Sequence, residues 1–199
     1  MEEKLREYAH LLVSVGLNLQ KDQTLILSSP VECAPFARLC ASAAYDLGVR
    51  EVVMNWSDDY MTREKFLRAQ DAAFETPRAW RKTFLTDYAE QGAAYLAIAA
   101  EDPETLLGVS PERLVAAQRT GAVERETFDR LQMANAFPWC VAGVPVAAWA
   151  RKVFPDKSES DAVAALWDAI LMTVRVTGDG KAEARWREHI ALLSARKQK

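Results

Sequence analysis

The fold is decided by the pattern of residues 22–56, which read DQTLILSSPVECAPFARLCASAAYDLGVREVVMNW. Apolar runs at 24–27 and 51–56 predict two strands, because each is too short for a helix and is bounded by polar or turn residues. Between them, apolar residues at helical spacing predict a helix that Gly48 ends; they are Phe36, Leu39, Cys40, Ala43 and Leu47. Continuous apolar strands joined through a helix indicate a parallel sheet that is covered on both faces.

The rest of the chain repeats this alternation and then becomes helical. Strands are predicted at 93–100 and 138–143. Helices are predicted at 3–16, at 78–91, from Pro111 onward, at 124–135, 145–154, 158–175 and 180–197. We therefore expect one α/β domain over residues 1–199: a parallel sheet of about four strands sandwiched by helices in Rossmann- or flavodoxin-like layers. Its sheet-bearing part is expected over 1–144 and an all-helical final part over 145–199.

The composition is that of an ordinary globular protein. The chain has 199 residues, is 50% hydrophobic and carries a formal net charge of -3, with 25 Lys and Arg against 28 Asp and Glu. This apolar fraction excludes a disordered chain, and the near-neutral charge disfavours a nucleic-acid partner. The sequence holds no run of about 18 apolar residues that could span a bilayer, so no membrane partner is expected. The charged amino terminus is unlike a secretory signal, and Cys33 and Cys40 are too far apart on their helix to pair, so a reducing, cytoplasmic location is expected.

The familiar nucleotide and hydrolase motifs are absent. The sequence has no G-x-G-x-x-G, no P-loop, no H-E-x-x-H and no C-x-x-C. In the turn after the first strand, Pro30 removes an N–H donor and Glu32 puts negative charge at the start of the next helix. A phosphate would be repelled there, so this turn is not expected to bind a nucleotide.

Polar residues follow the first three strands, and the ends of parallel strands are where open α/β sheets bind ligands. The pairs are Ser28 with Ser29, Asp58 with Asp59, and Glu101 with Asp102. Neighbouring carboxylates could hold a divalent cation or a substrate amine. The alternative, which is favoured, is that Asp and Ser at these positions only cap the following helices. Trp139, beside the fourth strand, is the remaining candidate for the lining of a cleft.

The histidines and cysteines give little support for a metal site or a nucleophile. His10 and His189 are each isolated on a predicted helix, and the three cysteines are expected to be small core residues. Cys140 lies at the end of a predicted strand, but no basic partner for it can be identified, so the thiol is expected to be inert. No catalytic residue and no metal ligand is therefore predicted in this chain.

Several segments resemble, in order along the whole chain, the metallo-aminopeptidases related to aminopeptidases T and S. The matching segments are Gly16-Leu17-Asn18-Leu19-Gln20-Lys21-Asp22-Gln23-Thr24-Leu25, Val52-Val53-Met54-Asn55-Trp56-Ser57-Asp58-Asp59, Ser110-Pro111-Glu112-Arg113, and Pro138-Trp139-Cys140-Val141-Ala142-Gly143-Val144-Pro145. Ala148-Trp149-Ala150, Val153-Phe154-Pro155, Leu166-Trp167 and Trp186 to Ala191 continue the likeness.

The resemblance implies two domains, of which this chain is similar only to the first, an α/β domain. It implies a second, catalytic domain, absent from this chain, with two zinc or cobalt ions held by Glu, His, Asp and Tyr side chains. A metal pair generates a hydroxide nucleophile and polarises the scissile carbonyl. The resemblance also implies a homodimer that encloses a cavity, peptide substrates cut at their amino end, and a first domain that borders access to that cavity. By itself, this chain is then expected to be inactive.

Two other hypotheses remain open. The chain could be a stand-alone binding module in which the strand-end carboxylates and the Trp139 region take a small amine or a peptide. It could also be an interaction domain that dimerises through helices. The region from Arg175 onward carries seven basic against three acidic side chains, which is typical of a helix that docks on an acidic body.

Overall fold

A four-stranded parallel sheet forms the centre of the structure, as the sequence predicts. In this computed structural model, which describes residues 1–100 and 102–197, the strands are β1 (Thr24–Pro30), β2 (Glu51–Ser57), β3 (Ala94–Ala99) and β4 (Trp139–Gly143). Their order is β2-β1-β3-β4, and every neighbouring pair is parallel. β1 is central and buried on both faces, which explains why its apolar run is unbroken.

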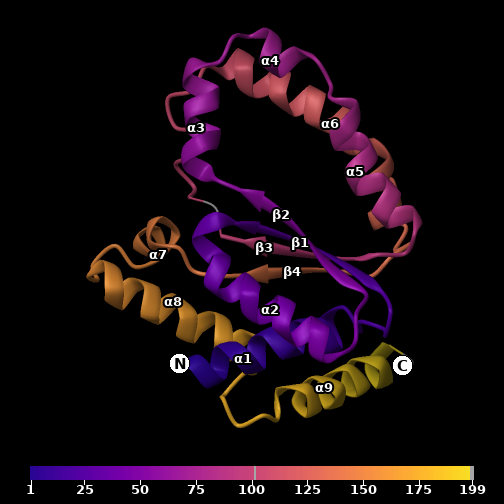
Figure 1. Ribbon diagram of the computed structural model, residues 1–199. Helices are drawn as coiled ribbons and strands as arrows, with labels where there is room; N and C mark the ends of the chain where they lie inside the picture. Colours follow the sequence, from indigo (N-terminus) through magenta and orange to yellow (C-terminus); the bar gives the residue numbers. More distant parts are fainter. Residues whose placement is uncertain (101, 198–199) are drawn as a thin grey trace.

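One face of the sheet is covered by α1 (Glu2–Leu11), α2 (Ala34–Asp46), α8 (Glu159–Thr173) and α9 (Ala182–Lys197) (Figure 1). On this face the side chains of the two central strands are fully buried at Leu25, Leu27, Ala94 and Leu96. Those of Val52, Met54 and Cys140 on the outer strands are partly buried. The short helix α7 (Ala147–Val153) packs on α8 through Ala150, Ala162 and Leu166. The predicted all-helical final part is confirmed, because every element described after β4 is a helix.

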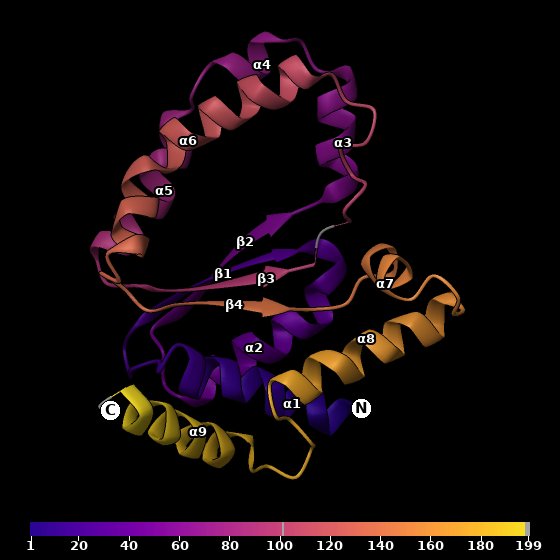
Figure 2. The same cartoon turned by 180° about the vertical axis from the view of Figure 1, so that it is seen from behind.

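The opposite face is covered only near the amino-terminal ends of the strands, by α5 (Ala79–Glu90) and α6 (Pro111–Met133). The small core there contains Ile26, Ala89, Ala93, Tyr95, Phe128 and Phe137. Farther along the same face of β4, Val141 is 55% exposed. Together with α3 (Asp59–Arg68) and α4 (Ala72–Glu75), α5 and α6 form what we call the helical arch, which rises away from the sheet (Figure 2).

Three predicted boundaries differ from the structure. β1 continues through Ser28 to Pro30, because these residues pair in register with Asn55 to Ser57 of β2. The first helix ends at Leu11 and is followed by a π-helical turn, Leu12–Gly16. The separate helix expected at 124–135 is part of α6, which runs unbroken through Gly121, since a single helical glycine costs only about 1 kcal/mol and α6 is packed against its neighbours.

None of the helices in the described residues is both long and apolar enough to cross a bilayer.

Candidate functional site at the carboxyl edge of the sheet

Ser28 and Ser29 lie within β1 near its carboxyl end. Ser29 is almost fully buried, and its hydroxyl donates to the carbonyl oxygen of Pro30 over 2.9 Å. The Ser28 hydroxyl accepts a hydrogen bond of 3.1 Å from the Asn55 side-chain amide on β2. Both hydroxyls are therefore engaged within the sheet, and neither is paired with a general base that could activate it.

The described strand-end carboxylates accept backbone N–H groups. Asp58 caps α3, with Oδ1 2.9 Å from the Met61 nitrogen. Asp59 Oδ2 lies 2.9 Å from the backbone nitrogen of Asp102, and Asp102 Oδ1 lies 2.9 Å from that of Glu104. The structure thus brings Asp59 and Asp102 together across two strand ends, while Glu101 lies outside the described residues. A capping or loop-ordering role accounts for each of these three carboxylates.

Two open depressions flank this cluster. One measures 380 Å³ and has Asp59, Arg63, Asp102 and Glu104 on its walls. The other measures 350 Å³ and shares Asp102 and Glu104, with Arg151 and Lys152 opposite. Lys152 pairs with Glu104 at 2.6 Å, and Arg63 donates to the carbonyl oxygens of Thr105 and Leu107. These groups can hold a polar ligand, but they include neither a histidine nor a thiol.

Trp139 does not join this cluster. It begins β4 and pairs in register with Tyr95 near the start of β3, so it lies toward the amino-terminal edge of the sheet. Its indole N–H donates to Asn135 Oδ1 over 3.2 Å. The strand-end carboxylates and Trp139 are therefore at opposite edges, and the structure does not form a single cleft from them.

The side chain of Cys140, which follows Trp139, lies on the face of the sheet that α1 and α2 cover. Its side chain is partly buried, and a Cβ added at Gly16 would stand 3.2 Å from its Sγ. Burial raises the pKa of the Cys140 thiol above its ordinary value. A thiol whose pKa is raised carries little thiolate near neutral pH, so the geometry does not support a nucleophile.

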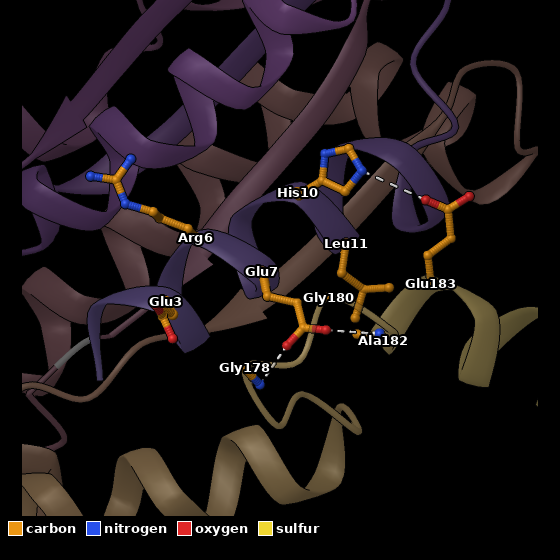
Figure 3. Close-up of a pocket in the computed structure, with 9 residues that line it drawn as sticks. All are labelled: Glu3, Arg6, Glu7, His10, Leu11, Gly178, Gly180, Ala182 and Glu183. Carbon is orange, nitrogen blue, oxygen red and sulfur yellow. Dashed lines mark hydrogen bonds and ion pairs between the residues drawn. The ribbon is translucent and has the colours of Figure 1, made fainter.

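A further pocket, of 390 Å³, lies where α1 meets the start of α9 (Figure 3). At its centre the Glu7 carboxylate accepts the backbone N–H of Gly178 over 2.6 Å and that of Ala182 over 2.8 Å. His10 Nε2 stands 3.6 Å from Glu183 Oε2, and hydrogen bonding by Arg187 lowers the pKa of the Glu183 carboxyl. Glu7 thus anchors the first turn of α9, a role that the sequence analysis missed.

The side chains that the structure describes do not fit a metal pair. Within 1–100 and 102–197, no three His, Cys, Asp or Glu side chains converge into a group that could hold an ion. His10 and His189 are each engaged locally, with Glu183 and with Arg175 and Trp186 respectively. We therefore derive no metal-dependent step from these residues.

Comparison with known proteins assigns the chain to a family. The sequence profile of the family described as thermophilic metalloprotease (M29) matches residues 1–199. The chain belongs to this family. It is 39% identical over 188 residues to Aminopeptidase 2 of Geobacillus stearothermophilus, a match that covers 94% of this chain and 45% of that protein. It is 40% identical over 200 residues to Aminopeptidase PepS of Streptococcus thermophilus, covering 98% of this chain and 47% of that one.

The fold is similar to that of a protein of solved structure. Wild-type AmpT from Thermus thermophilus superposes with a TM-score of 0.85 at 30% identity, over 98% of this chain and 49% of AmpT. The resemblance to the aminopeptidase T and S proteins and the α/β fold class are both confirmed. The chain spans about half the length of the relatives that it matches.

Proposed function

We propose that this chain is the amino-terminal α/β domain of a dinuclear metal-dependent aminopeptidase, which removes amino-terminal residues from peptides. The observation that carries the proposal is the family match over residues 1–199, at 39–40% identity to proteins named aminopeptidases. The two zinc or cobalt ions and the catalytic side chains belong, on this proposal, to a separate catalytic domain. No step of the hydrolysis is assigned to a residue described here.

The role proposed for this domain is that of scaffold and gate. Its support is the way the polar groups at the sheet edge are used: Asp58, Asp59 and Asp102 each accept a backbone N–H. Such bonds order the loops around the edge, and a carboxylate that is already engaged is a poor candidate for proton transfer. We propose that these ordered loops border access to the active-site cavity of the parent enzyme.

The proposed partners are the catalytic domain and a second copy of the parent. α9 is docked through its first turn, whereas Ile190, Leu192 and Leu193 farther along are 47–54% exposed. Apolar side chains grouped on one helix are typical of a contact surface, and we propose that the catalytic domain covers them. A cytoplasmic location and a homodimer are parts of the same proposal.

Metal binding tests this proposal. Isothermal titration of the purified chain with zinc and then cobalt, after dialysis against a chelator, is expected to show no stoichiometric binding tighter than about 10 μM, because isolated surface carboxylates bind such ions weakly. Elemental analysis of the chain as purified provides the check. Stoichiometric zinc or cobalt would contradict the proposal, since it would place a metal centre in this domain.

A further inference from the structure

A recessed pocket lies at the point where all four helices of the arch meet. It measures 230 Å³, and its walls come from α3 (Thr62, Lys65), α4 (Phe74), α5 (Arg81) and α6 (Glu124), with Arg78 just before α5. We call it the cationic pocket. It is separate from the carboxyl edge of the sheet and from the pocket beside α9, with which it shares no lining residue.

The charges of the cationic pocket are not balanced. Three cations, Lys65, Arg78 and Arg81, face one carboxylate, Glu124, whose side chain is 10% exposed. Glu124 Oε1 accepts the backbone N–H of Arg78 over 2.8 Å, and Oε2 lies 3.9 Å from Arg81. Among the described carboxylates, none forms an ion pair with the side chain of Lys65 or Arg78.

The environment of Lys65 in the pocket disfavours its positive charge. Burial lowers the pKa of the Lys65 ammonium, and the positive charges of Arg81 and Arg78 lower it further, with only partial compensation by Glu124. Like charges held together in this way are relieved by a bound anion, which supplies the missing countercharge.

The floor of the pocket is held in place before any ligand arrives. Phe74 is 2% exposed and stacks on Phe66 with ring centroids 4.9 Å apart. Arg113 pairs with Asp71 at 2.8 Å, donates to the Phe66 carbonyl oxygen over 2.7 Å and lies over the Phe74 ring. Thr120 donates to the Phe74 carbonyl oxygen over 2.5 Å. The floor is therefore fixed before binding, whereas Lys65, Arg78 and Arg81 are exposed side chains that a ligand would order.

We propose that the cationic pocket binds a carboxylate of a peptide, either its terminal carboxylate or an acidic side chain. A pocket of 230 Å³ has room for one such group, and an Arg guanidinium can hold a carboxylate through two parallel hydrogen bonds. The choice of a peptide carboxylate over phosphate rests on the proposed function, since peptides are its substrate class. An enzyme that works on the amino end of a peptide leaves the other end free to be held in this way.

The test is a ¹H–¹⁵N NMR titration of the full chain at low ionic strength, with four probes. They are tri-alanine as the free acid, tri-alanine amide, Ala-Asp-Ala amide and inorganic phosphate. The free acid and the Asp-containing amide are expected to shift the backbone amides of Thr62, Arg78 and Gly121, with a Kd of about 1 mM, which is typical of one exposed charge-assisted contact. Tri-alanine amide is expected to leave them unchanged.

Matched variants locate the binding. Lys65→Gln and Arg81→Gln are each expected to weaken it about fivefold, because each removes one cation from a partly exposed site. Lys82→Gln, which removes a neighbouring charge that does not line the pocket, is expected to change it less than about twofold. Glu124→Gln keeps an acceptor for the Arg78 N–H and removes the competing charge, so binding is expected to tighten.

Three results would overturn the inference: equal shifts with the acid and the amide, shifts with phosphate alone, or equal weakening by Lys82→Gln and Lys65→Gln. Because the titration needs no catalysis, its failure is distinct from failure of the proposed function. That function is tested by metal binding and by peptide hydrolysis instead.

Discussion

The two faces of the sheet are packed to very different extents. On the face beneath α1, α2, α8 and α9, side chains from every strand enter one large core that includes Leu25, Leu27 and Leu96. On the face beneath the arch, the core is a small group around Ile26, Tyr95 and Phe128. The first face supplies most of the buried apolar area, and therefore most of the stability, because hydrophobic stabilisation scales with that area. The second leaves helices free to carry a pocket away from the core.

The largest expected effect is the loss of a core side chain on the packed face. Leu96→Ala is expected to lower the free energy of unfolding by about 2–5 kcal/mol, because it removes a fully buried side chain and leaves a cavity. Val141→Ala, on the opposite face and 55% exposed, is expected to change it by less than about 0.5 kcal/mol. Urea unfolding followed by circular dichroism measures both, and similar losses would show that the two faces are packed alike.

The next largest loss of stability is expected where Glu7 of α1 binds the start of α9. Glu7→Gln is expected to lower the free energy of unfolding by about 1–3 kcal/mol, since Glu7 makes two charge-assisted hydrogen bonds to backbone N–H groups. Hydrogen exchange at the Gly178 and Ala182 amides is expected to accelerate. Glu3→Gln changes a residue in the same pocket that makes neither bond, and it serves as the control. Unchanged exchange at both amides would rule out the anchoring role.

Alkaline pH tests the packed face in another way. Burial raises the pKa of the Cys40 thiol from 9.0 to about 12, so the folded state keeps its proton while the unfolded chain loses it. This contribution to stability is therefore complete well below pH 9 and falls as the pH rises from 9 toward 12, by an amount on the order of 1 kcal/mol at pH 10. Burial also raises the pKa of Tyr8, which adds a loss of the same sign at higher pH.

The Cys40→Ala variant isolates the part that is due to the thiol. Between pH 7.5 and pH 10 its loss of unfolding free energy, measured in urea with a reductant present, is expected to be smaller than that of the unmodified chain by an amount on the order of 1 kcal/mol. Equal losses in the two proteins would mean that Cys40 is not buried as the structure describes.

The smallest effect is expected at the base of the arch. Asp58→Ala is expected to cost about 1 kcal/mol, because it removes the side chain that caps α3 through the Met61 N–H. Asp58→Asn retains a good capping group and is expected to be nearly neutral. A comparable cost for Asp58→Asn would point to a role for the negative charge itself, and so to the ligand site that remained an alternative to capping.

The sheet could be predicted from sequence because its strands are short apolar runs with clear turn signals at their ends. Leu25 to Leu27 is buried on both faces, so a local pattern was enough. The continuous α6 was harder to predict, because Gly121 and a polar stretch interrupt the helical spacing of apolar residues in the sequence. In the folded protein, packing against neighbouring helices keeps the helix continuous through them. Ser28 and Ser29 were expected beyond β1 because seryl and prolyl residues usually end a strand, whereas pairing with β2 extends it.

The polar sites depend on contacts that no local pattern contains. Glu7 is 171 residues from Gly178 and 175 from Ala182, so nothing near it in sequence signals its role. The cationic pocket gathers side chains from four helices, and the only hint is the excess of basic residues between Arg63 and Lys82. The separation of Trp139 from the strand-end carboxylates follows from the direction of β4, which its position in the sequence does not reveal.

The central claim is that this domain provides scaffold and access, while the chemistry of peptide hydrolysis belongs elsewhere in the parent enzyme. Its most direct test is the hydrolysis of leucine p-nitroanilide by the purified 199-residue chain, in the presence of zinc and then of cobalt. The account predicts a rate equal to that of buffer with the same metal. Metal-dependent, saturable release of p-nitroaniline that co-purifies with the folded chain would contradict it.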